Sequence, residues 1–485
     1  MSRLKSMLAF DLREARNYLR ESWAIGWPMM LVMFFQFSIG IADVYVAGLL
    51  GPDILASVGY VGQLYWTLMI LANAISVGTV SMVSQAYGAK SGVGVGHIAA
   101  NSTMLGLLVS GVITIISRVY AQEIISLSGM PESIRGIAEN FIRIFSLVLL
   151  PTYLMIITSG ILRASGRVKT AMIFSCVTSL LNVIGDFVLV YGHGPIPSFG
   201  YQGIAWSSAF ATTVGMVLNL SSVFRGPYRI TIKTIGTPIC ACLRNLIRLG
   251  VPTALQQTAW NAGTLVVYFL ITKLEGSQVT ALAAITAGVR VEAIIFLPIF
   301  AFNMAAAVVA GNKLGAKDFS GARTGAKVTA FLCVSIILLP TAAIFWFAPE
   351  ISGLLTGDPD VLAEMTRYLR INMLGEPFLA WGISLAGTLQ GAGDTFGTMR
   401  IIFVSMWLFR IPFIVFAIYA LNIGPTGIWW CMATSVLIMC VLLVHRFRGD
   451  KWMNASMDKD KKTMLWESCL PIQASMPADK TMDDN

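Results

Sequence analysis

Long apolar runs, separated by short stretches rich in charge, Gly or Pro, dominate the chain. Each run has about 20 residues or more, which is the length that an α-helix needs to cross the hydrocarbon core of a bilayer. The pattern therefore predicts an all-α integral membrane fold with twelve transmembrane helices. We expect them at residues 23–49, 57–84, 98–117, 138–160, 170–191, 203–224, 247–273, 280–310, 327–347, 366–389, 399–421 and 426–446.

Composition agrees with this pattern. The 485 residues are 56% hydrophobic and only 12% charged, whereas soluble chains carry about 25% charged residues. A soluble enzyme and a disordered chain are therefore excluded. The net charge of +9 reflects sidedness, because 26 Lys and Arg residues fall on the side of the two termini and five on the other. Basic residues concentrate on the cytoplasmic side. We expect a multi-pass protein of the plasma membrane (in bacteria, the inner membrane) with both termini cytoplasmic, and no nucleic-acid partner.

The two halves of the chain repeat each other. Residues 85–90 (QAYGAK) match residues 312–317 (NKLGAK) at an offset of 227, and shorter matches near the ends have an offset of 224. Six spans in each half give both repeats the same orientation. We therefore expect two parallel-topology six-helix bundles related by a pseudo-two-fold axis along the membrane normal. The predicted parts are a cytosolic N-terminal segment (1–22), a first bundle (23–224), a cytosolic linker (225–246), a second bundle (247–446) and a disordered cytosolic tail (447–485).

Short motifs lie in order on five of these spans: Trp27-Pro28 with Gln36 and Asp43, Ser84-Gln-Ala-Tyr-Gly-Ala, Asn182-x-x-x-Asp186, Gly288-Val-Arg290-Val-Glu292, and Arg410-Ile-Pro412. Together they resemble the multidrug and toxic compound extrusion (MATE) family of cation-coupled antiporters, over about residues 23–446. The resemblance implies alternating access, in which lipophilic or cationic compounds leave the cell in exchange for H⁺ or Na⁺. We expect small organic cations or drugs and membrane lipids as partners, and a monomer.

Acidic side chains inside the spans mark the candidate coupling site, since a charge within the bilayer is costly and points to function. Asp43 lies in the first span, and Asp186 lies in the fifth, four residues after Asn182 and so on the same helix face. Their oxygens could hold a small cation or relay a proton without any cofactor, because an apolar environment favours the neutral form of a carboxylic acid. Neither acid recurs in the second half. The alternative is a structural role, in a hydrogen bond or an ion pair with an intramembrane Arg.

The family resemblance implies the same cation site. It assigns coupling to Asp43, Asn182, Asp186 and Ser208, and the first three would be metal ligands if the ion is Na⁺. Some family members carry a further Glu on the seventh span. This chain has Trp260 at the nearest position, so the resemblance does not imply a second cation site there.

Substrate contacts are expected from acids, aromatics and Met within the spans, since π faces attract organic cations. Glu292 could form a salt bridge or face the substrate. Glu376 precedes Pro377, so it could cap backbone groups that the proline frees, or attract a cation. The candidates are Gln36, Tyr45, Tyr65, Met69, Trp260, Glu292 and Glu376.

Two other functions compete with efflux. The first is a flippase of lipid-linked precursors from the same superfamily, which the acidic character of the candidate cavity disfavours. The second is a membrane enzyme, but the chain has no HExxH, GxSxG or P-loop pattern. We therefore propose no catalytic residue.

The seven cysteines do not indicate a disulfide framework, because most of them lie in apolar runs. Cys240-x-Cys242 lies in a basic stretch without nearby His or further Cys. We therefore expect no metal site there.

Overall fold

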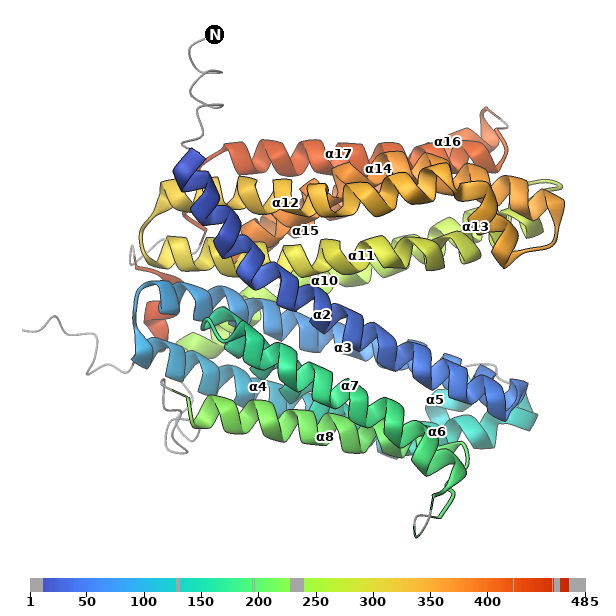
Figure 1. The fold of residues 1–485 in the computed structure, drawn as a ribbon, viewed down its shortest axis with the longest axis horizontal. Helices are drawn as coiled ribbons and strands as arrows, with labels where there is room; N and C mark the ends of the chain where they lie inside the picture. Colours follow the sequence, from blue (N-terminus) through green and yellow to red (C-terminus); the bar gives the residue numbers. More distant parts are fainter. Residues whose placement is uncertain are drawn as a thin grey trace, which may run out of the picture. The chain divides into compact units, whose positions relative to one another are not determined.

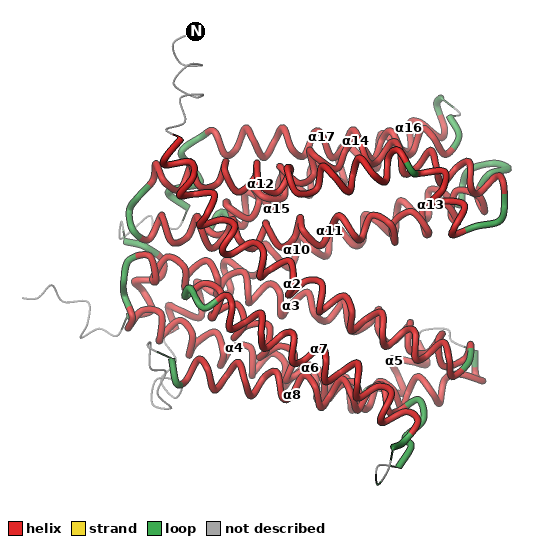
Figure 2. The backbone as a smooth tube through the Cα atoms, in the orientation of Figure 1, coloured by secondary structure: helices red, strands yellow, loops and turns green. Residues whose placement is uncertain are grey.

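The computed structural model describes residues 12–127, 131–193, 195, 197–226, 240–421, 423–455, 457 and 463–470. Regular structure in this part of the chain is helical, with no β-strand (Figure 2). Among the described residues, ten helices are long and apolar enough to cross a membrane. Two more, α10 (Cys240–Ile271) and α14 (Pro359–Gly391), have 32 and 33 residues and bring charged residues into their first turns. The all-α prediction and its twelve spans are confirmed.

The helices group into two compact units, which we call the N-lobe and the C-lobe. The N-lobe comprises Phe34–Gly250, Gly315–Lys317 and Ser456–Asn485, and the C-lobe comprises Met1–Met33, Val251–Leu314 and Asp318–Ala455. Two of the boundaries fall inside helices, α2 (Leu12–Leu50) and α10, and none falls in the predicted linker (225–246). Each of these two helices contributes one part to each lobe.

In the N-lobe, α6 is the central helix. It packs against α3, α4, α5 and α8, while α7 packs against α8 (Figure 1). Apolar side chains from α3, α6 and α8 fill the core between them. Besides the second part of α2, the helices are α3 (Pro52–Gly88), α4 (Gly92–Val119), α5 (Ala121–Leu127), α6 (Glu132–Ala164), α7 (Val168–Tyr191) and α8 (Gln202–Phe224).

In the C-lobe, α14 has the matching central position and packs against α12, α13, α15 and α17 (Figure 1). The eleventh span is divided into α15 (Thr395–Phe403), a π-helix, η1 (Val404–Arg410), and α16 (Ile411–Tyr419). π-helical turns occur frequently at functional sites. The remaining helices are α11 (Gln278–Gly315), α12 (Phe319–Trp346), α13 (Ala348–Leu355) and α17 (Pro425–Arg448).

Matching turns support the internal repeat. Lys90 and Lys317, which are 227 residues apart, are the only non-Gly residues of the described chain with positive φ, at 58° and 60°. Each is followed by a helix N-cap, Ser91 or Asp318, whose side chain accepts from the backbone N–H three residues later. The two turns share one conformation because they share one sequence pattern.

The predicted first span, 23–49, lies within a longer helix, because α2 runs from Leu12 to Leu50 without a break. Two expectations need correction. The part of the predicted disordered tail at Leu465–Cys469 is ordered, since it forms a 3₁₀-helix, η2, with buried side chains, and residues 471–485 lie outside the described residues. Cysteine pairing also occurs, because Cys242 and Cys469 form a disulfide. Hydropathy did not reveal that bond, because it joins residues 227 positions apart.

Candidate functional site

A buried polar cluster in the N-lobe begins with α7 and α8. Asp186 and Asn182 lie one turn apart on α7, and their side chains are 0% and 1% exposed. The Asn182 amide donates to the Ser208 hydroxyl of α8 at 2.9 Å. Ser207 lies beside Asp186, and its hydroxyl donates to the backbone oxygen of Asn182 at 2.7 Å. No pattern in the sequence pointed to Ser207, whose neighbour Ser208 was the expected residue.

Asp43 completes this cluster from α2. Its carboxyl group lies beside the Asp186 carboxyl group and the Asn182 amide group. Tyr65 of α3 is also near Asp43, but its hydroxyl donates to Thr152 at 2.8 Å. The four residues predicted for coupling are thus brought together from three helices.

The cluster is rich in acceptors and poor in donors. Asp43 Oδ1, Asn182 Oδ1 and both Asp186 carboxyl oxygens are buried and have no hydrogen-bond donor in the described part of the chain. Within the N-lobe, no described Lys or Arg forms an ion pair with either Asp. Two carboxyl groups in contact in an apolar bundle need a proton or a cation between them.

A second polar cluster lies in the C-lobe, around Arg410. The Arg410 guanidinium donates to the Ser435 hydroxyl at 2.7 Å and lies 5.4 Å from the ring centroid of Trp260. Glu292 and Tyr368 are close to it. Arg410 is only 8% exposed. The cation therefore lies on an aromatic face and beside an acid, an arrangement that also suits an organic cation.

Glu376 adds a second acid to the C-lobe cluster. Glu292 and Glu376 are each 5% exposed and interact with one another. Glu292 Oε1, Glu376 Oε2 and the Tyr368 hydroxyl lack a hydrogen-bond partner among the described residues. This argues against the expected capping role for that oxygen of Glu376. No pattern in the sequence indicated that Tyr368 would lie in this cluster.

The remaining substrate candidates are not gathered into either cluster. Gln36 and Tyr45 are exposed on α2, and Tyr45 keeps 59% of its surface. Met69 is buried in a packing cluster with Leu149 and Tyr153, which favours a structural role.

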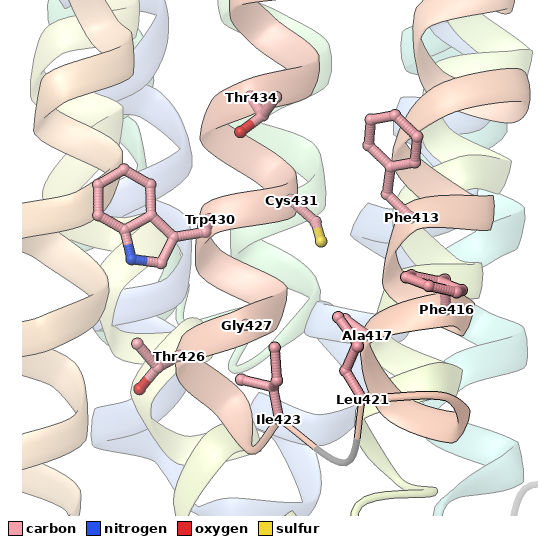
Figure 3. Close-up of a pocket in the computed structure, with 10 residues that line it drawn as sticks. All are labelled: Phe413, Phe416, Ala417, Leu421, Ile423, Thr426, Gly427, Trp430, Cys431 and Thr434. Carbon is pink, nitrogen blue, oxygen red and sulfur yellow. The ribbon is translucent and has the colours of Figure 1, made fainter.

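An apolar groove of about 290 Å³ opens between α16 and α17 (Figure 3). It includes Phe413, the repeat counterpart of Asp186 at offset 227, so an aromatic side chain replaces the acid in the second half. Both polar clusters lie elsewhere. The groove is lined by Phe413, Phe416, Ala417, Leu421, Ile423, Thr426, Gly427, Trp430, Cys431 and Thr434.

Ser208→Ala tests whether the Ser208 hydroxyl, which accepts a hydrogen bond from the Asn182 amide, orients the N-lobe cluster. Loss of one partner of a buried polar group costs about 1–3 kcal/mol. If the cluster binds the coupling ion of the efflux that we propose below, the ion concentration for half-maximal transport should therefore rise about tenfold, since 1.4 kcal/mol is a factor of ten. Ser208→Thr keeps the hydroxyl and is the control. The hydroxyl has no such role if Ser208→Ala and the wild type show the same ion dependence of efflux.

Comparisons with known proteins agree with this architecture. The chain is 24% identical over 437 residues to the "Probable multidrug resistance protein NorM" of Thermotoga maritima, covering 89% of this chain and 93% of that protein. It is also 24% identical over 439 residues to the protein of the same name from Acinetobacter baylyi, covering 89% and 96%. An "Uncharacterized transporter YisQ" of Bacillus subtilis is 22% identical over 436 residues, covering 90% and 95%.

Solved structures share the fold. A MOP superfamily transporter from Pyrococcus furiosus superposes with a TM-score of 0.83 at 21% identity, covering 91% of this chain and 97% of that one. A mutant of the Vibrio cholerae MATE transporter VcmN also has a TM-score of 0.83, at 18% identity, with coverages of 90% and 97%. The MatE family profile matches residues 28–188 and 252–416. The chain therefore belongs to the MatE family, the family of multidrug and toxic compound extrusion proteins that its motifs resemble.

Proposed function

We propose that this protein is a secondary active multidrug efflux transporter, which exports lipophilic or cationic compounds in exchange for H⁺ or Na⁺. The observation that carries the proposal is the pair of buried carboxyl groups, Asp43 and Asp186, which interact without a basic partner in the N-lobe. The names of relatives, probable multidrug resistance proteins, support the class of cargo.

The N-lobe cluster would bind the coupling ion. A proton shared by the two carboxyl groups, or a sodium ion held by Asp43, Asp186 and Asn182 with Ser208 behind them, would neutralise the pair. The bound and free states then differ in charge, so they favour different arrangements of the helices that carry these residues. Asp43 lies on α2, which continues from the N-lobe into the C-lobe. Ion binding can therefore act on both lobes through one continuous helix.

The C-lobe cluster would contribute to substrate binding. Glu292 and Glu376 supply negative charge, and Trp260 offers the aromatic face that now holds Arg410. Coupling requires ion and substrate to bias one conformational equilibrium in opposite directions. The same two acids disfavour an anionic lipid-linked cargo. In this proposal the protein acts as a monomer in the plasma membrane, with both termini cytoplasmic.

Dye efflux from proteoliposomes tests the proposal directly. We expect one imposed gradient, either of protons or of sodium, to drive ethidium transport, and we expect the other gradient to have no effect. The gradients are applied separately, and an ionophore that dissipates the active gradient should stop transport. Efflux that is unaffected by either gradient and by the ionophores would contradict ion coupling.

A further inference from the structure

A short segment of the C-terminal tail is docked on the N-lobe. Its 3₁₀-helix η2 packs against α3 and α4. Leu465 and Trp466 are buried at 3% and 7% exposure. The Trp466 ring lies so close to Gly94 that a Cβ there would come within 2.9 Å of it. Close packing of apolar side chains therefore holds this segment on the N-lobe.

The first turns of α10 hold the other side of the same segment. The Asn245 amide donates to the backbone oxygen of Leu465 at 3.2 Å and to the Ser468 hydroxyl at 2.8 Å. Three residues earlier on α10, Cys242 is bonded to Cys469, and both are 0% exposed. Their Cα atoms are 4.7 Å apart, within the range of protein disulfides. We call this tail segment with its disulfide the clasp.

The tail also has an anchor in the C-lobe. Trp452 is fully buried, stacks on Phe447 and donates from its indole N–H to the Phe447 backbone oxygen at 2.9 Å. Asp450 forms an ion pair with Arg323 at 2.5 Å. Trp452 thus fixes the tail to the C-lobe, and Cys469 fixes it to the N-lobe.

We propose that Cys242 and Cys469 form a reversible redox site, which fastens the tail when oxidised and releases it when reduced. The inference rests on the proposed orientation, in which both sulfurs lie on the cytoplasmic side. Cytosolic disulfides are rare, and those that exist are mostly transient, catalytic or redox-sensing. A disulfide on the cytoplasmic side therefore fits a redox-sensing role better than a permanent structural bond.

The reductant would be a cytosolic dithiol. One of its thiolates attacks a sulfur of the clasp and forms a mixed disulfide, while the other clasp sulfur leaves as a thiolate and takes up a proton. The second thiol of the reductant then displaces the remaining clasp sulfur. Two electrons and two protons pass to the protein, and the reductant becomes a disulfide. Because both sulfurs are buried, attack requires local opening of the short η2 segment, which needs less free energy than global unfolding.

The site has a route to the transport cycle through α10. Residues Cys240–Gly250 of this helix belong to the N-lobe and the rest belongs to the C-lobe. Close packing surrounds the crossing, because a Cβ at Gly250 would lie 3.1 Å from the Ala74 backbone oxygen. An oxidised clasp fastens the first turns of α10 to η2, α3 and α4, all of them in the N-lobe. The same tail is also anchored in the C-lobe at Trp452, so the oxidised clasp shortens the free chain between the two anchors. Alternating access needs the lobes to move, so the oxidised protein should transport more slowly.

The first experiment measures the redox state of the clasp in cells. Cells expressing the full chain are quenched in acid, free thiols are alkylated, disulfides are reduced, and the new thiols receive a second label for mass spectrometry. In diamide-treated cells we expect both Cys242 and Cys469 to carry the second label, which marks a disulfide. In cells given dithiothreitol we expect both to carry the first label, which marks free thiols. Two results would overturn the proposal: free thiols at both positions after diamide, or a disulfide that resists dithiothreitol in native membranes.

The second experiment measures ethidium transport in inside-out vesicles, whose cytoplasmic face is accessible. We expect dithiothreitol to raise the initial rate about fivefold over diamide-treated vesicles, the low end of typical coupling effects. The Cys242→Ser/Cys469→Ser variant should transport at the reduced rate under both conditions. Cys240→Ser is the matched control, because Cys240 is exposed and unbonded on the same helix, and it should keep the response to dithiothreitol. A wild-type rate independent of redox conditions would overturn the proposed effect on transport.

The two experiments separate this inference from the proposed function. Chemical reduction of the wild type requires no substitution, so it remains informative if the double variant fails to fold. If the wild type moves no dye under any condition, the proposed efflux function fails. Labelling of Cys242 and Cys469 still decides in that case whether the clasp is reversible.

Discussion

Asp43→Asn is expected to abolish ion-coupled efflux while leaving the protein folded. In the wild type, the Asp43 and Asp186 carboxyl groups interact in a buried cluster that has no basic partner within the N-lobe. Asparagine can neither take up a proton nor offer a charge to sodium. The variant therefore lacks the change of charge that would connect ion binding to the two conformational states.

The fold should tolerate this change, because the amide has nearly the same shape as the carboxyl group and can donate to Asp186. A donor next to a buried carboxylate removes an unsatisfied acceptor, which otherwise costs about 1–3 kcal/mol. We therefore expect the midpoint of thermal unfolding to remain at or above that of the wild type. Loss of transport without loss of stability would separate a coupling role from a structural one.

The measurement is norfloxacin or ethidium efflux from cells and proteoliposomes, together with thermal unfolding of the purified protein. Asp53→Asn makes the same chemical change at an exposed position in the first turn of α3, and it should transport normally. In the proposed mechanism Asp43 and Asp186 bind one ion together, so adding Asp186→Asn should cause little further loss. Wild-type efflux by folded Asp43→Asn would refute the assignment of this site.

Gly387→Ala is expected to be among the most destabilising small substitutions in the chain. A Cβ at Gly387 would overlap the backbone oxygen of Asn303 on α11, and one at Gly391 would overlap that of Ala307. These residues are four apart on both helices, so α14 and α11 approach each other along a stripe of small residues, as membrane helices often do. Backbone atoms cannot rotate away, and the helices must separate.

Overpacking of this kind costs about 1–3 kcal/mol, and occasionally more. The clash falls on backbone, and the Asn303 amide is also fixed by its bond to the Ile383 backbone oxygen at 2.7 Å. We expect a lower yield of monodisperse protein and a clear fall in the unfolding temperature, both measured in the same detergent.

Gly160→Ala is the matched control, because Gly160 is the counterpart of Gly387 at offset 227. A Cβ there would meet only side-chain atoms, Ser76 Oγ at 2.9 Å and Val80 Cγ2 at 3.2 Å. At the next turn the first repeat already has Ala164 where the second has Gly391. The milder effect is thus expected for Gly160→Ala, and equal stability of the two variants would contradict the explanation.

Much of the N-lobe site could be predicted from the sequence. Asn182 and Asp186 are four residues apart on a helix, so their common face follows from helical geometry. An acid such as Asp43 within an apolar span stands out because so few charges enter the bilayer. Tyr368 and Ser207 could not be found in this way, because Tyr and Ser are ordinary residues in membrane helices. Their proximity to acids depends on how separate helices pack.

By itself, the sequence determined the membrane fold, the twelve spans, the repeat and the candidate acids. These properties depend on hydropathy and periodicity, which are local along the chain. The tertiary structure alone decided that Asp43 meets Asp186, that Arg410 lies near both Trp260 and Glu292, and that Cys469 returns to Cys242. Each of these contacts joins helices or segments far apart in sequence. Helix packing selects such contacts, and no pattern within a single span records them.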